Sequence, residues 1–145
     1  MVALVIVAVP LGGCLPTRKN DFDIAARNVS KERLDEVRLE FGGFSESFGV
    51  LIPNANAQFS GYVGAFPTRA KLTWRLPGRA YMPDITVVIP VPQERPALER
   101  GKAQRYELRF ELDGKTATAK YIINDYTWMR ELEKTENWPA VKPDQ

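Results

Sequence analysis

The segment Arg69-Ala70-Lys71-Leu72-Thr73-Trp74-Arg75-Leu76 decides the fold class, because apolar and polar side chains alternate along its whole length. A period of two places successive side chains on opposite faces of an extended strand. We therefore predict a buried face that contains Trp74 and an exposed face that is rich in cations. Pro77 and Gly78 follow directly and end the strand.

Short segments of similar character recur on both sides of this one, and Gly and Pro separate them. The predicted strands are residues 22–29, 37–41, 44–52, 59–66, 69–76, 85–89, 106–112 and 117–121. Aromatic residues and glycine crowd the strand at 59–66, which is typical of a bulge or bend. A helical turn after Ser30 and another between Pro96 and Gly101 are expected in the polar connections.

Asp113-Gly114 is the strongest hairpin signal in the chain, since both central positions of a type I′ turn need positive φ. Alternating strands flank this dipeptide on both sides. A two-residue loop here places large side chains opposite small ones, as a packed sheet face prefers. The predicted pairs are Phe110 with Ala117, Leu108 with Ala119 and Tyr106 with Tyr121.

About seven or eight short strands without a long helix predict an all-β fold, an antiparallel two-layer sandwich. A small closed barrel is the alternative. We place the sandwich domain at residues 21–125 and a C-terminal extension at 126–145.

The composition excludes several classes of function. The 145 residues include no histidine and one cysteine, which removes imidazole chemistry and any intramolecular disulfide. The four serines lack the spacings of serine hydrolases. A net charge of +2 gives no broad field for nucleic acid, and no nucleic-acid partner is predicted. Asp21 and Asp23 lack the spacing of a calcium loop, so we interpret them as solvated acids and predict no metal or cofactor.

The N-terminal residues 1–13 are uncharged and contain an apolar run from Val2 to Val9. This run is too short to cross a membrane, which takes about 20 apolar residues, and it is typical of an export signal. Neither Lys nor Arg precedes the run, so we expect translation to start upstream of Met1. A buried strand with an ordinary core cysteine is the alternative interpretation.

The tetrapeptide Leu11-Gly12-Gly13-Cys14 resembles the lipobox of bacterial lipoproteins: an aliphatic residue, two small residues and a cysteine. The passages at 41–44, 49–53 and 70–74 are similar to uncharacterised bacterial lipoproteins with an immunoglobulin-like domain. The lipobox resemblance implies cleavage after Gly13 and acylation of Cys14, with residues 14–20 as a tether. Under Gram-negative sorting, Leu15 in place of Asp implies the periplasmic face of the outer membrane.

Two surfaces are candidate binding sites. The first is the cationic strand face formed by Arg69, Lys71 and Arg75, which would suit an acidic partner or anionic glycan. The alternative is a solvated face neutralised across strands. The acids that could neutralise it are Glu40, Glu107 and Glu111.

The second candidate surface is the set of aromatic side chains in the C-terminal extension. Tyr126, Trp128 and Trp138 could stack on sugar rings or enter a partner's pocket. The alternative, which we favour, has them folding back onto the sandwich, with Trp128 and Leu132 on one face of a short helix.

These observations favour a lipid-anchored, non-enzymatic module of the cell envelope that binds an envelope protein or glycan. An inhibitor or immunity protein that occludes a periplasmic hydrolase is the second interpretation. It would need a projecting loop, for which residues 53–58 and 93–105 are the candidates. An enzyme built on a pair of carboxylates is the third.

Overall fold

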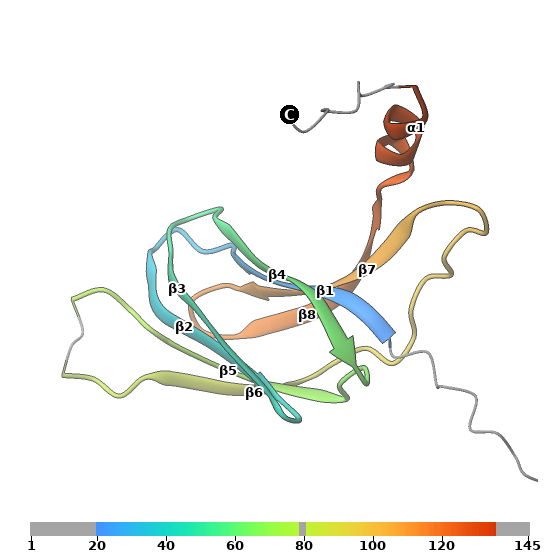
Figure 1. Cartoon of the computed structure of the whole chain (residues 1–145). Helices are drawn as coiled ribbons and strands as arrows, with labels where there is room; N and C mark the ends of the chain where they lie inside the picture. Colours follow the sequence, from blue (N-terminus) through green and yellow to red (C-terminus); the bar gives the residue numbers. More distant parts are fainter. Residues whose placement is uncertain (1–19, 79–80, 136–145) are drawn as a thin grey trace, which may run out of the picture.

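The computed structural model describes residues 20–78 and 81–135, which form two facing four-stranded sheets followed by one helix (Figure 1). The strands are β1 (Asn20–Asn28), β2 (Leu34–Phe41), β3 (Phe44–Leu51), β4 (Asn56–Gly64), β5 (Arg69–Arg75), β6 (Ile85–Pro90), β7 (Gln104–Leu112) and β8 (Ala117–Asp125), and the helix is α1 (Thr127–Thr135). The predicted all-β class is confirmed.

The sheets have the strand orders β4-β1-β7-β8 and β3-β2-β5-β6. The predicted two-layer sandwich is confirmed, and among the described residues neither sheet closes into a barrel. The antiparallel prediction is wrong for one pair, since β1 runs parallel to β7 from Phe22 beside Tyr106 to Asn28 beside Leu112. Five strands separate β1 and β7 along the chain, so no tight hairpin forces them to be antiparallel.

The core lies between the two sheets, and Trp74 is at its centre. Ala70, Leu72 and Trp74 are 2%, 0% and 0% exposed, which confirms the predicted inward face of β5. The indole Nε1–H of Trp74 donates to the carbonyl of Gly114 at 3.2 Å, linking one sheet to the β7–β8 turn of the other. Phe22 and Phe110, from the other sheet, are also fully buried in this core.

The β7–β8 hairpin has a different register from the predicted one. Leu112 pairs with Ala117 and Phe110 with Ala119, so the loop has four residues, 113–116. The Asp113 side chain accepts hydrogen bonds from the amides of Lys115 and Thr116 at 2.9 and 2.8 Å, which closes this wider loop. A shift of two residues leaves each side chain on its predicted face.

The predicted bulge is confirmed in β4. Phe22 pairs with Tyr62 and Ile24 with Phe59, so two residues of β4 lie opposite Asp23. Gly61 takes a φ of 76° there, a conformation that glycine adopts without strain.

The helical turns predicted in the connections are absent from the described residues. Ser30 donates its hydroxyl proton to the side chain of Asn28 at 2.6 Å and does not cap a helix. The loop at 93–103 is held by its side chains: the Tyr106 hydroxyl donates to the Pro96 carbonyl at 2.6 Å, and Arg95 lies over the ring of Phe66 at 3.8 Å. The bond from Tyr106 satisfies the Pro96 carbonyl, and the contact of Arg95 with Phe66 holds the loop against the sheets.

The two ends of the sandwich differ. At one, which we call the helix end, β1 begins and β8 leads into α1, which stands away from the sheets (Figure 1). At the other, the hairpin end, loops 29–33, 52–55 and 113–116 meet the β5–β6 connection. The described parts of that connection, 76–78 and 81–84, extend beyond the neighbouring loops (Figure 1).

Candidate functional site

Two acids that alternation assigned to solvent are buried on the outer face of the β1–β7 pair. Asp23 and Glu107 are neighbours in the parallel register, and their side chains are 2% and 4% exposed. The interpretation of Asp23 as a solvated acid is therefore wrong, whereas Asp21 is 55% exposed. Side chains from β7, from β8 and from Tyr126 contact these carboxylates, which a pattern along one strand does not reveal.

Every oxygen of this acidic pair has a donor. Asp23 accepts from the Gly61 amide at 3.1 Å and the Tyr126 hydroxyl at 3.3 Å, with Arg105 Nη2 3.5 Å away. Glu107 accepts from Arg109 Nε at 2.6 Å and Asn124 Nδ2 at 3.0 Å. Because the carboxylates are enclosed and hydrogen-bonded to neighbouring groups, this pair is not placed to act on a substrate as a catalytic acid and base.

The cationic strand face is balanced at two of its three positions. Lys71 pairs with Glu40 at 2.6 Å, and Arg75 pairs with Asp84 at 2.9 Å and Glu36 at 3.4 Å. These contacts support the predicted alternative of neutralisation across strands. They also raise the pKa of Arg75, mainly through its hydrogen bond to Asp84.

Of the three predicted neutralising acids, only Glu40 reaches this face, because Glu107 and Glu111 lie in the other sheet and pair with Arg109 and Lys120. Arg69 is exposed at the rim of a groove of about 500 Å³ at the helix end. The groove contains the aromatic rings of Phe41, Tyr62 and Phe66.

The C-terminal aromatic residues separate into two environments. Tyr126 packs against the sheet, and burial, followed by the charge of Asp23 and the hydrogen bond to it, raises its pKa. Trp128 is 58% exposed on α1, so the favoured prediction that it folds back onto the sandwich is wrong. Trp138 and the lipobox residues Leu11, Gly12, Gly13 and Cys14 lie outside the described residues.

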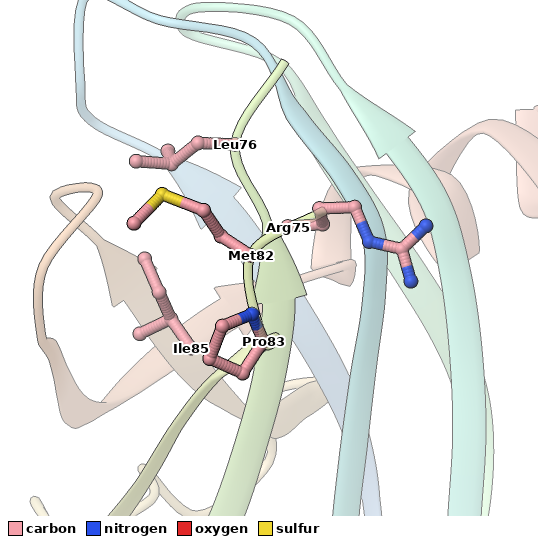
Figure 2. A pocket seen from close by; sticks show the side chains of 5 residues that line it. All are labelled: Arg75, Leu76, Met82, Pro83 and Ile85. Carbon is pink, nitrogen blue, oxygen red and sulfur yellow. The ribbon is translucent and has the colours of Figure 1, made fainter. Parts of the chain in front are cut away.

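A small apolar cavity opens at the hairpin end. It has a volume of about 120 Å³, and its walls are formed by Leu76, Met82, Pro83, Ile85 and the stem of Arg75. Figure 2 shows Leu76, Met82 and Ile85 on one side of the hairpin, whereas the Arg75 guanidinium points away toward its acidic partners. The apolar walls suit a hydrophobic side chain or chain segment.

A wider and more polar depression of about 490 Å³ continues from this cavity, sharing Leu76 and Ile85. Its rim includes Lys31, Glu32 and Lys115 from the neighbouring loops. We call the cavity and the depression together the hairpin-end cleft. Cations and anions alternate around an apolar floor, which is the usual anatomy of a protein-binding patch.

The loops that border the hairpin-end cleft are held in place by hydrogen bonds from polar side chains. Asn28 is fully buried, and its side-chain amide donates to the carbonyls of Glu32 at 2.7 Å and Leu51 at 2.8 Å. Asp113 closes the opposite loop, and its hydrogen bonds from the amides of Thr116 and Lys115 lower its pKa. The cleft is therefore preformed on rigid supports.

Large side chains beside the cleft are exposed. Tyr81 is 104% exposed and Met82 57%, while Ile52 on an adjacent loop is 60% exposed. The sequence interpretation treated 77–83 only as a strand break and missed them. A detectable signal existed, because Tyr81 and Met82 are large residues between Pro77-Gly78 and Pro83, where a turn usually carries small polar ones.

No family model matches the chain, and no curated protein does. A solved structure described as the NMR structure of the protein from Eubacterium rectale is 14% identical, with a TM-score of 0.42. The match covers 74% of this chain and 91% of that one. At this score the likeness bears on neither fold nor function.

The described residues contain no helix long and apolar enough to span a membrane. They also contain no group of three or more His, Cys, Asp or Glu side chains arranged to hold a metal ion.

Proposed function

We propose that this chain is a lipid-anchored, non-enzymatic binding module of the bacterial cell envelope, and that its hairpin end engages a partner protein or envelope polymer. The anchor is supported by Leu11-Gly12-Gly13-Cys14, and Leu15 supports the periplasmic face of the outer membrane. Binding needs apolar and aromatic anchors on a rigid frame, and the hairpin-end cleft supplies them.

The observation that carries this proposal is the exposure of Tyr81 and Met82 beside an apolar cavity. Both side chains lie at the end opposite the start of β1, from which the chain leads back toward Cys14. An anchor at Cys14 would hold the helix end near the membrane and direct the hairpin end away from it. The exposed side chains would then face the compartment where partners are available.

The anchor is tested by labelling cells that express the protein with an alkyne fatty acid. Wild-type protein should be labelled, and Cys14→Ser should not, because Cys14 is the only thiol in the chain. Equal labelling of both proteins would exclude the lipoprotein.

The binding end is tested with a photoactivatable phenylalanine analogue placed at Tyr81 in living cells. A discrete crosslinked adduct is expected from this position. Val63 is the matched control, because it is a large apolar residue, 52% exposed, on β4 near the helix end. Equal adducts from both positions, or none from position 81, would show that the hairpin end is not the binding surface.

The hairpin also favours a second function, that of a hydrolase inhibitor. Residues 76–78 and 81–84 extend beyond the neighbouring loops, so that Tyr81 could fill a partner's cleft (Figure 1). The loops predicted for this role, 53–58 and 93–105, contain no aromatic side chain that could fill a cleft in the same way. Soluble Cys14→Ser protein should then inhibit a peptidoglycan hydrolase of the envelope, and Tyr81→Ala should abolish inhibition without lowering the melting temperature. Unchanged inhibition by Tyr81→Ala would exclude this mechanism.

A further inference from the structure

Helix α1 has an apolar face that is exposed. Trp128, Met129 and Leu132 are 58%, 45% and 48% exposed. At 3.6 residues per turn, these three positions fall within an arc of about 100° on the helix surface. Arg130 and Glu131 are exposed on the remainder of the same turn, so the described part of α1 is amphipathic and carries no net charge.

The first residues of α1 are tied to the sheet that contains β1. The Tyr126 amide donates to the Ala103 carbonyl at 2.7 Å, and the Ala103 amide donates to the Thr127 hydroxyl at 3.0 Å. The Tyr126 side chain crosses to Asp23 of β1. These contacts determine where the helix leaves the sheet.

The helix leaves the sandwich at the end where β1 begins. Asp21 of β1 pairs with Arg105 of β7, and Arg105 lies opposite Asn124, close to the end of β8 (Figure 1). Five residues, 15–19, separate Cys14 from Asn20, and the six steps of chain between these two residues span at most about 20 Å. The helix itself is about 14 Å long.

We infer that the exposed face of α1 formed by Trp128, Met129 and Leu132 docks on the lipid surface of the membrane that holds Cys14, an inference that rests on the proposed anchor. The short reach from Cys14 brings the helix end to that surface. Tryptophan beside aliphatic side chains is the composition that inserts at the boundary between headgroups and acyl chains. The anchor raises the local concentration of lipid, so three half-exposed side chains suffice for docking.

The test uses a fluorescent probe on α1 of the lipoprotein itself. With Cys14 acylated, Met129→Cys supplies the only free thiol, which is labelled with an environment-sensitive nitrobenzoxadiazole dye. The purified protein is reconstituted in vesicles of phosphatidylethanolamine and phosphatidylglycerol. The probe emission should shift to the blue and should be quenched by lipids that carry nitroxides on their acyl chains. The matched control is Lys31→Cys, an exposed position at the hairpin end, whose probe should remain in water.

A second variant measures the contribution of the apolar face. Removing half the surface of one such side chain from water changes an equilibrium constant by about tenfold. Adding Trp128→Gln and Leu132→Gln to the labelled protein should therefore lower the ratio of docked to undocked helix about a hundredfold. The melting temperature should be unchanged, because neither residue belongs to the buried core. Raising the salt from about 50 to about 500 mM should not reverse the shift, because the contact is apolar.

The outcomes separate docking from anchoring when the mass of the protein is measured in parallel. A lipidated protein whose probe at residue 129 behaves like the control overturns the docking alone. A protein without lipid on Cys14 overturns both the anchor and the docking that depends on it. A shift in envelope extract that does not occur in pure vesicles assigns the face to a protein partner and overturns the lipid proposal.

Discussion

Replacing Trp74 should destabilise the whole sandwich. Trp74 is 0% exposed between the sheets, and removing a buried side chain of this size costs about 3–5 kcal/mol. Trp74→Ala also leaves the buried Gly114 carbonyl without its donor, which adds about 1–3 kcal/mol. The free energy of unfolding of a domain of this size is about 5–15 kcal/mol. The variant should therefore be largely unfolded, or its melting temperature should be roughly 15–30 °C below that of the wild type.

Two companion variants separate packing from hydrogen bonding and from surface charge. Trp74→Phe keeps most of the ring packing and loses the bond to Gly114, so we expect a loss of about 1–3 kcal/mol from the unmet carbonyl. Arg75→Ala removes ion pairs of a side chain that is 35% exposed, which should cost less than about 1 kcal/mol.

Urea unfolding monitored by circular dichroism measures these differences, with the midpoint compared at constant slope. Equal midpoint shifts for Trp74→Ala and Arg75→Ala would refute the assignment of the two faces of β5. A shift of the midpoint for Trp74→Phe as large as for Trp74→Ala would show that the hydrogen bond, and not packing, dominates.

The outer network of β1 yields three further predictions. Asp23→Ala should cost about 1–3 kcal/mol in urea unfolding, because it leaves the Gly61 amide and the Tyr126 hydroxyl without their acceptor. Asp21→Ala, at an exposed position, should cost under about 1 kcal/mol, and equal costs would contradict this. The raised pKa of Tyr126 means that the folded state retains the phenolic proton above pH 10, where the unfolded state loses it. The free energy of unfolding of the wild type should therefore fall more steeply above pH 10 than that of Tyr126→Phe. Parallel curves of unfolding free energy against pH would exclude this linkage. Hydrogen bonds from the Thr127 hydroxyl and amide lower the pKa of Asp125 to about 2. The contribution of the Asp125 carboxylate to stability should therefore be complete above pH 3.8 and lost as the pH falls through about 2. An NMR titration should show that Thr127→Val raises the pKa of Asp125, and an unchanged value would reject the assignment.

Periodicity predicted which face of each strand is buried, because the alternation of apolar and polar residues can be followed along one strand without reference to the others. The predicted segment 69–76 corresponds to β5, Arg69–Arg75, with the inward residues as expected. Periodicity does not state which strands are neighbours, and the parallel β1–β7 pair was therefore missed. The hairpin register depended on the Asp113 side chain, whose two bonds to backbone amides favour a four-residue loop over the two-residue turn that Asp-Gly suggests.

The candidate sites were harder to predict, because they depend on contacts between distant segments. Asp23 and Glu107 were interpreted as solvent-facing acids, and both are contacted by residues far along the chain: Asp23 by Arg105 and Tyr126, and Glu107 by Asn124. The helix at Trp128 was foreseen, but its amphipathic pattern indicates an apolar face without identifying what that face contacts. The hairpin-end cleft requires three loops to converge, and alternation within strands carries no information about loops.

The two ends of the molecule are stabilised by different contacts, so their proposed roles should be separable. The loops at the hairpin end that contain Asn28 and Gly114 are tied to the interior, through the Asn28 side chain and through the bond from Trp74 to Gly114. Helix α1 is held through Tyr126 and Thr127, which contact one sheet at its outer face and edge. Loss of the bond from Tyr126 to Asp23 should therefore loosen the attachment of the helix and leave the contacts of the cleft in place. A module with a rigid recognition end and an adjustable membrane end can bind a partner at a distance from the bilayer without its core deforming.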